Sequence, residues 1–155
     1  MLRPMLLRAL LLWSLWACLL GSPASFAAET PFAVIVGPGV AEHHLSAGEV
    51  ALIYRRKQNF WADGKRIHPV NLPPSHPLRR SFSQNVLGLP PEALEEYWRE
   101  MYFHGVLPPH VLASEKAVLL FVGSTPGAIG YVSSCLPESG VRVVLSVGEL
   151  SPCSK

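Results

Sequence analysis

The chain lacks an excess of charge of either sign over its main part. Its 155 residues contain 13 Lys and Arg against 11 Asp and Glu. Arg3 and Arg8 lie in the N-terminal segment, so eleven basic residues face eleven acidic ones from residue 28 onward. A surface without a basic field does not attract nucleic acid or an anionic membrane through its charge. The sequence therefore predicts no nucleic-acid partner.

The sequence also lacks the patterns that bind metals or perform catalysis. Its six histidines are scattered, without an i, i+4 pair on a helix or a Cys/His cluster. The adjacent His43 and His44 on an extended loop do not converge easily on one ion. No Gly-x-Ser-x-Gly elbow surrounds Ser133 or Ser134. We expect no metal, no cofactor and no enzymatic activity.

Only one long apolar run is present, and it lies at the N-terminus. Arg3 and Arg8 precede the run from Leu10 to Leu20, and the small-residue site Ser25-Phe26-Ala27 follows it. This order is typical of a secretory signal peptide. The run is short for a spanning helix, which needs about 20 apolar residues. We expect residues 1–27 to be a signal peptide cleaved before Ala28, residues 28–155 to form one exported domain, and no spanning helix.

Cysteine is scarce, with three residues in the chain. Cys18 offers an alternative lipidation site, although the bulky Trp16 and the apolar Leu19-Leu20 fit such a site poorly. Cys135 and Cys153 remain as an even pair in an oxidising compartment. We expect a disulfide between them that ties the C-terminal tail to the domain and stabilises it by about 3 kcal/mol. Two free thiols are the alternative.

Strand and helix patterns alternate along residues 28–155. Apolar runs predict strands over residues 32–36, 66–72, 128–133 and 141–147. Helices are expected after Ser46, from Leu78 to Val86, from residue 94 to 102, and from residue 114 to 122. Ser46 and Glu49 form a capping box at the first of these. Such alternation predicts an α/β fold with about four mostly parallel strands and four helices packed on the sheet.

Two of these helices have patterns that predict burial. In the third, the core-stripe spacing is kept by Leu94, Tyr97, Trp98, Met101 and Tyr102. The fourth, over residues 114–122, is apolar nearly all round, so we expect it to be buried.

Three segments resemble the phosphate-type periplasmic solute-binding proteins, which have the type II periplasmic binding protein fold. The first runs from Leu45-Ser46-Ala47-Gly48-Glu49 to the turn Trp61-Ala62-Asp63-Gly64. The second comprises the strand through Val70, the Ser75 loop and the helix that carries Phe82. The third, Pro126-Gly127-Ala128-Ile129-Gly130-Tyr131, is very close to a segment of that family. The resemblance covers most of residues 33–132 and implies one lobe of the fold.

The resemblance also implies where an anion would bind. Ser75 stands at the serine of the family's Ser-Gly-Thr helix start, and helix N-terminal amides favour anions. His76 and Pro77 replace the glycine and threonine, and Pro77 has no N–H. Asn71 occupies the place of the phosphate-pairing arginine, so one bidentate contact is missing. We take Ser75, His76, Asn71 and Arg79 as the anion site, with Arg80 adding positive field.

Two features of the sequence each have two possible interpretations. Ser75 either contacts an anion or caps the following helix. Arg55, Arg56, Lys57, Lys65 and Arg66 either attract an anion or belong to a helix C-terminus and its adjoining loop.

Two hypotheses follow for the whole protein. The first is an exported solute-binding module that resembles the substrate-binding protein of phosphate ABC transporters. It would bind phosphate or a similar small anion without catalysis and deliver it to a membrane transporter. The second is a periplasmic protein-interaction or scaffold module that keeps the lobe fold but has lost the anion site. Either module is compatible with a homodimer, in which two lobes rebuild a cleft.

Overall fold

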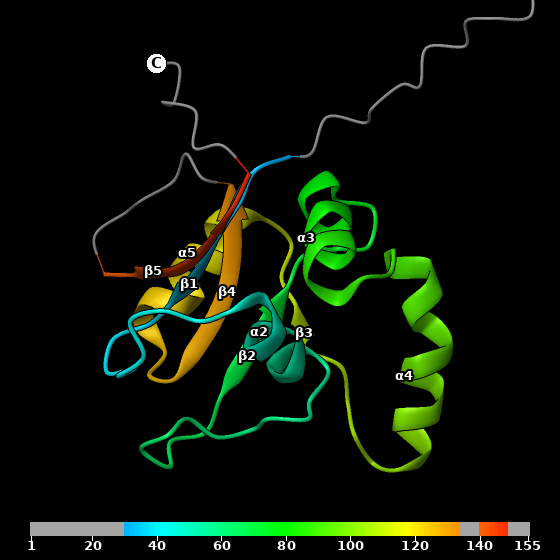
Figure 1. Cartoon of the computed structure of the whole chain (residues 1–155), viewed down its shortest axis with the longest axis horizontal. Coiled ribbons are helices and arrows are strands. Elements are labelled where there is room, and N and C mark those ends of the chain that lie inside the picture. Colours follow the sequence, from blue (N-terminus) through cyan, green and yellow to red (C-terminus); the bar gives the residue numbers. More distant parts are fainter. Residues whose placement is uncertain (1–29, 134–139, 149–155) are drawn as a thin grey trace, which may run out of the picture.

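The computed structural model describes residues 30–133 and 140–148 (Figure 1). Their elements are β1 (Phe32–Val36), α2 (Ala47–Tyr54), β2 (His68–Asn71), α3 (Pro77–Leu87), the 3-10 turn η1 (Pro91–Ala93), α4 (Leu94–Phe103), β3 (His110–Val111), α5 (Glu115–Ser124), β4 (Ala128–Ser133) and β5 (Arg142–Val147). The expected signal peptide, Cys18, Cys135 and Cys153 lie outside the described residues. Within the described ranges, no helix has the length and apolarity needed to cross a membrane.

The five strands form one mixed sheet in the order β3-β2-β4-β1-β5. β2 pairs in parallel with β3 and β4, whereas β1 pairs antiparallel with β4 and β5. Four of these strands therefore point one way, and β1 runs against them. The expected α/β fold with mostly parallel strands is confirmed. Strand β3 was not predicted, because it has two exposed residues and no apolar run.

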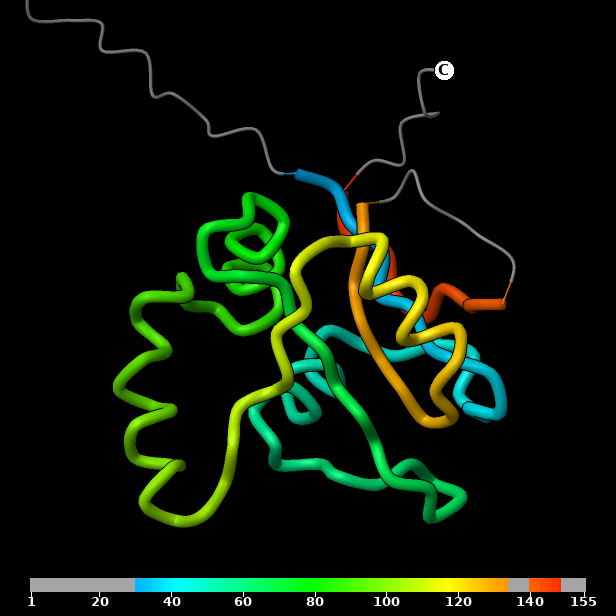
Figure 2. Tube along the Cα trace, turned by 180° about the vertical axis from the view of Figure 1, so that it is seen from behind, coloured from blue at the N-terminus to red at the C-terminus, as the bar shows by residue number. Residues whose placement is uncertain are grey.

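Helices cover both faces of the sheet, with α2 and α3 on one face and α5 on the other (Figures 1 and 2). Successive residues of β4 show the alternation. The ring of Tyr131 stacks on Phe82 of α3, with 4.0 Å between centroids. Gly130 faces α5 so closely that a Cβ there would lie 2.6 Å from a Val118 methyl carbon. The apolar core fills both layers around β1 and β4.

The helix starts follow the expected capping chemistry. The Ser46 hydroxyl accepts a hydrogen bond from the Glu49 amide at 3.3 Å, and the Glu49 carboxylate accepts the Ser46 amide at 2.8 Å. These bonds hold the pKa of the Glu49 carboxyl below its ordinary value. Ser114 caps α5 through the Ala117 amide at 3.2 Å. The capping box predicted at α2 is confirmed.

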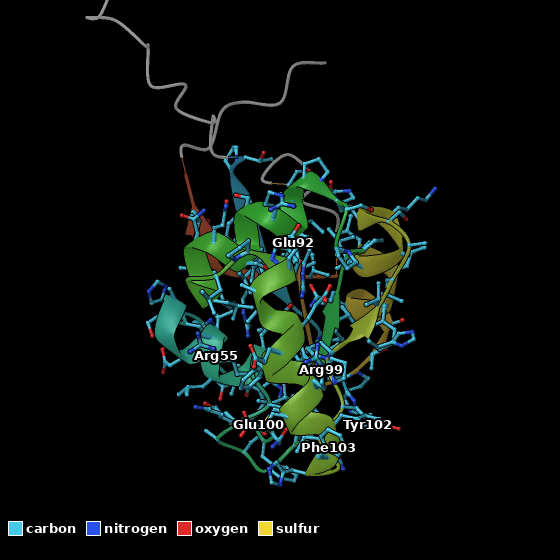
Figure 3. All side chains as sticks on the ribbon, turned by 90° about the vertical axis from the view of Figure 1, so that its right-hand side faces the viewer. Arg55, Glu92, Arg99, Glu100, Tyr102 and Phe103 are labelled. Carbon is cyan, nitrogen blue, oxygen red and sulfur yellow. The ribbon has the colours of Figure 1, made fainter. Side chains whose placement is uncertain are left out.

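Helix α4 departs from the expected burial. Only Leu94 of its predicted stripe is buried, while Tyr102 is 65% exposed and the following Phe103 is 82% exposed. The helix lies at the side of the molecule and contacts mainly η1, and Figure 3 shows Tyr102 and Phe103 near its far end. The stripe is amphipathic as predicted, but no neighbouring element among the described residues covers its second half.

Helix α5 is also less buried than its composition predicts. Val118, Leu119 and Val122 lie against the sheet, but Leu120 is 61% exposed. A helix that packs on a single sheet face buries one side only, so the expectation of burial all round was wrong.

Candidate functional site

The expected anion loop lies where β2 ends and α3 begins. β2 and β4 run parallel, so their carboxyl ends, Asn71 and Ser133, lie at the same edge of the sheet. Helix α3 starts directly after this edge at Pro77, and α5 starts at Glu115 after β3. In open α/β sheets, ligands bind at the carboxyl ends of the strands, where helix N-termini also gather. The topology therefore brings Asn71 and the Ser75 loop to a place suited to binding.

Asn71 is engaged within the fold. Its side chain is buried, and its Oδ1 accepts a hydrogen bond from the Tyr131 hydroxyl. The same hydroxyl accepts the Leu72 amide at 3.2 Å. Burial raises the pKa of Tyr131 well above its ordinary value, so this hydroxyl stays protonated and able to donate. The Asn71 side chain thus anchors the start of the loop to β4.

The first turn of α3 offers fewer amides than a free helix start would. His76 is the N-cap, and its Nδ1 accepts the Leu78 amide at 3.2 Å. Pro77 has no N–H to donate. Ser75 is exposed and does not cap the helix, so the capping alternative for Ser75 was wrong. The N-cap of α3 is therefore the imidazole of His76 and not the hydroxyl of Ser75.

A carboxylate stands beside the loop. Glu115 Oε1 lies 3.9 Å from His76 Nε2, and Glu115 Oε2 accepts the Ser133 amide at 2.7 Å. Sequence reasoning identified Ser114 and Glu115 only as a helix start. Glu115 reaches the site because α5 begins at the edge where β4 ends, and that placement is tertiary. The sequence shows Glu115 as an acidic residue in the first turn of a helix. It does not show that His76 and Ser133 lie beside this carboxylate.

Arg79 is the buried cation of the site. Its side chain is 7% exposed, and its Nε and Nη1 have no hydrogen-bond partner among the described residues. Burial lowers the pKa of the guanidinium, and the nearby Tyr131 and Tyr54 act in the opposite direction. Two buried nitrogens of a charged group without partners are costly to the fold, since their desolvation is not offset by a bond.

Arg80 is placed differently from Arg79. It is exposed and pairs with Glu92 through both carboxylate oxygens. These bonds also lower the pKa of the Glu92 carboxyl. Because Glu92 neutralises Arg80, the positive field expected from Arg80 is reduced, and Arg79 is left as the cation available at this edge.

The segments that carried the family resemblance meet in space. Trp61 Nε1 donates to the Gly127 carbonyl at 3.0 Å, and the His68 amide donates to the same oxygen at 3.1 Å. Tyr54, at the end of α2, donates from its hydroxyl to the Val70 carbonyl at 3.0 Å. The Trp-x-Asp-Gly turn, the start of β2 and the Pro-Gly-Ala segment are therefore one connected unit that positions the Asn71 loop.

The described residues contain no group of three or more His, Cys, Asp or Glu side chains close enough to hold an ion. Ser133 ends β4, and its amide is bonded to Glu115. Ser134 and Cys135 lie outside the described residues.

The fold is similar to that of two solved proteins. A protein of Clostridium perfringens, assigned as a phosphate ABC transporter substrate-binding protein and solved with bound phosphate, is 20% identical with a TM-score of 0.59. An ABC-type phosphate transport receptor from Vibrio cholerae is 17% identical with a TM-score of 0.58. The matches cover 73% and 80% of this chain, respectively.

This likeness shows the fold. The chain spans 43% of the first of these proteins and 52% of the second, which is about half the length of each. The expected α/β architecture of one lobe is confirmed, in that the chain matches a partial lobe of a phosphate-binding-protein-like fold. The chain matches no protein-family model and no curated protein.

Proposed function

We propose that this protein is a solute-binding module that binds phosphate or a similar small oxyanion without catalysis. The site is the sheet edge with Asn71, Ser75, His76 and Arg79. The observation that carries the proposal is the buried Arg79 guanidinium, whose Nε and Nη1 have no partner among the described residues. An oxyanion offers the acceptors that this group lacks and would offset its desolvation. The likeness to a solved protein with bound phosphate supports the same ligand class.

The other residues of the site have supporting roles in this proposal. Ser75 is exposed at the loop and presents a hydroxyl to solvent. His76 holds its Nδ1 on the helix start, so its Nε2 is the nitrogen that faces outward toward Glu115. Asn71 keeps the loop in place through Tyr131. The Glu115 carboxylate accepts but does not donate hydrogen bonds, so it favours an oxyanion that carries a proton, such as phosphate, over sulfate.

The setting of this activity is part of the proposal. In this proposal the expected signal peptide directs the protein to the periplasm, and the module there hands its ligand to a membrane transporter. The proposal includes a homodimer as a partner state, in which a second copy supplies the facing side of a cleft.

A second candidate function is favoured by the state of the helix start. His76 already uses the Leu78 amide, Pro77 has none, and Asn71 is bonded to Tyr131. These features remove donors that an anion would need. In this alternative the lobe fold is kept for contacts with other periplasmic proteins, and Arg79 remains a buried charge without a ligand.

Calorimetric titration separates the two functions. Purified protein, freed of bound phosphate by unfolding and refolding, is titrated with phosphate and then with sulfate. We expect saturable phosphate binding with a Kd below about 10 μM, near −7 kcal/mol, and weaker binding of sulfate. Arg79→Met should abolish the heat and Ser75→Ala should reduce the affinity.

Arg99→Met is the matched control, because Arg99 is an exposed arginine on α4 (Figure 3). Its phosphate affinity should equal that of the unchanged protein. No heat from either anion, or equal phosphate affinity after Arg79→Met, would contradict the proposal. The absence of heat would favour the interaction module.

A further inference from the structure

The basic residues around the end of α2 differ in whether their side chains have partners. They are Arg55, Arg56, Lys57, Lys65 and Arg66. Arg55 donates from Nη2 to the Leu87 carbonyl at 2.7 Å, at the end of α3. Lys65 pairs with Asp63 at 2.7 Å and donates to the Gly39 carbonyl at 2.9 Å. Both of these side chains therefore have structural partners. Arg56 and Arg66 differ from them, because they line the same depression of the surface.

This depression consists of two adjoining hollows, which we call the basic groove. One has a volume of about 340 Å³ and is lined by Arg56, Asn59, Phe60, Arg66 and residues 105–107. The other, of about 190 Å³, is lined by Arg56, residues 66–70, residues 107–110 and Phe121. The two hollows share Arg56, Arg66 and Leu107. The groove thus lies between the turn after α2 and the loop that joins α4 to β3.

The charge of the basic groove is not balanced by the part of the chain that the structure describes. There, no Asp or Glu lines either hollow, and the ion pairs join other side chains. Burial and then the neighbouring Arg66 lower the pKa of the Arg56 guanidinium. Two like charges that face one groove without a carboxylate attract an anion, because each is stabilised by a shared counter-charge.

The backbone at Arg56 is also unusual. Its φ of 59° is in the left-handed region, and within the described residues it is the only non-glycine with a positive φ. The Asn59 side-chain amide donates to the Arg56 carbonyl at 3.1 Å and holds this conformation. Arg56 directly follows the C-cap residue Arg55, a position where helices commonly end in a left-handed residue, so this turn fixes the point at which Arg56 leaves the end of α2.

The groove also has apolar flanks. Phe60 is 56% exposed and Leu107 is 61% exposed, and both line the larger hollow. Large apolar side chains exposed beside a pocket are typical of sites that bury part of a ligand. A bare inorganic ion would leave these flanks in water, so they favour a ligand with an apolar body.

We propose that the basic groove is a second binding site, for a small organic anion that has a carboxylate or phosphate group on an aromatic or aliphatic body. The anionic group lies between Arg56 and Arg66, and the body packs on Phe60 and Leu107. The groove runs along the first part of β2, whereas the phosphate site starts at Asn71 where β2 ends. Arg79 does not line the groove, so the two sites are separate.

Two-dimensional amide NMR of the purified ¹⁵N-labelled protein tests this site. The probes are phenyl phosphate, inorganic phosphate and benzyl alcohol, each added in a separate titration. We expect phenyl phosphate to give saturable shifts at Phe60, Arg66 and Leu107. Inorganic phosphate should bind at the groove at least about tenfold more weakly, since it gains no apolar contact, and benzyl alcohol should leave these amides unshifted.

Substitutions identify the groups that bind. Arg56→Gln and Arg66→Gln should each weaken phenyl phosphate at the groove by about tenfold or more. Lys57→Gln is the control, because Lys57 is an exposed neighbouring cation outside the groove, and its affinity should be unchanged. Arg66 is exposed, so Arg66→Gln keeps the test valid if Arg56→Gln disturbs the turn.

Two results would overturn the proposal. One is phenyl phosphate affinity that is equal in both arginine variants and the unchanged protein. The other is a set of shifts confined to residues 75–80, which would place the probe at the start of α3. That second result would contradict the groove site but not the proposed phosphate site at the start of α3. If instead phosphate does not bind at that site and phenyl phosphate still shifts the groove amides, the phosphate proposal fails and the groove proposal stands.

Discussion

Gly127 is a single residue on which several contacts of the fold converge. Its carbonyl accepts hydrogen bonds from Trp61 Nε1 and from the His68 amide. Its φ of +78° is in the left-handed region, and a Cβ there would lie 2.5 Å from the Arg66 carbonyl oxygen. A backbone oxygen cannot swing aside as a side chain can. Glycine is therefore required at this position by both conformation and space.

We expect Gly127→Ala to destabilise the protein by about 3 kcal/mol or more, because the collision adds to the strain of a positive φ. Urea unfolding followed by circular dichroism measures the loss. Gly88→Ala is the matched control, since Gly88 has a φ of +71° and a Cβ added there would meet nothing within 4 Å. It should cost only about 1–2 kcal/mol. Equal losses in the two variants would show that the contact with Arg66 is unimportant.

Among the α-helices of the described residues, α4 is the one least tied to the rest of the molecule, since Leu94 alone of its residues is buried. It packs mainly on η1, and it is held to the end of α2 by a bond from the Tyr97 hydroxyl to the Arg55 carbonyl at 2.8 Å. α5 has the same length of ten residues but packs against β4 and β1. Local stability follows buried contacts, so the two helices should open independently.

Amide hydrogen exchange measured by NMR checks this difference. We expect the amides of Leu94–Phe103 to exchange through openings that cost far less free energy than global unfolding. Those in the second half of α5 should be protected nearly as well as β4. If α4 and α5 exchange at the same rate, the helices belong to one cooperative unit and the interpretation of α4 is wrong.

The elements were largely predictable because most of them have local signals. The run Phe32–Val36, the capping box at Ser46 and the strand Ala128–Ser133 matched the structure. β3 was missed because its pairing to β2 is a tertiary event without an apolar run. The exposure of α4 was missed because periodicity reports which side of a helix is apolar, and not whether a neighbour covers it.

The candidate site was less predictable than the elements. Ser75, His76 and Asn71 were assigned to one loop by the family resemblance. The bond that holds Asn71 comes from Tyr131, and the carboxylate near His76 belongs to Glu115, and both partners are far away in sequence. The burial of Arg79 and the sharing of one groove by Arg56 and Arg66 depend on how separate elements meet. No local pattern encodes that meeting.

At the scale of the whole molecule, the core on one sheet face is built around aromatic side chains, two of which are phenols. Tyr54, Phe82 and Tyr131 contact one another, with centroids of Tyr54 and Phe82 4.6 Å apart. Burial raises the pKa of Tyr54 and of Tyr131 well above the ordinary value of a tyrosine. The folded protein therefore holds both phenolic protons more tightly than the unfolded chain does.

The pH dependence of stability follows from these two groups. Below about pH 10 both states keep the protons, so the contribution to stability is fully present. Above about pH 10 the unfolded chain loses its protons while the fold retains them, so the free energy of unfolding falls as pH rises. We expect thermal unfolding midpoints to drop progressively as the pH rises above about 10.

The doubly substituted protein Tyr54→Phe/Tyr131→Phe isolates this effect. It should be less stable at neutral pH, because it loses the hydroxyl bonds to Val70, Asn71 and Leu72. Its midpoint should nevertheless fall less steeply on the alkaline side. The same slope in both proteins would mean that other groups govern the alkaline transition.

The position of β1 in the sheet governs the order in which the chain can fold. Phe32–Val36 is the first strand in sequence, yet its partners are Ile129–Ser133 on one side and Arg142–Val147 on the other. A chain made from its N-terminus must carry this apolar strand unpaired until residues 129–147 have emerged. Such high contact order slows folding and exposes the strand to aggregation. A chain truncated before β4 would therefore be incompletely folded and prone to aggregation, and would not form a smaller stable domain.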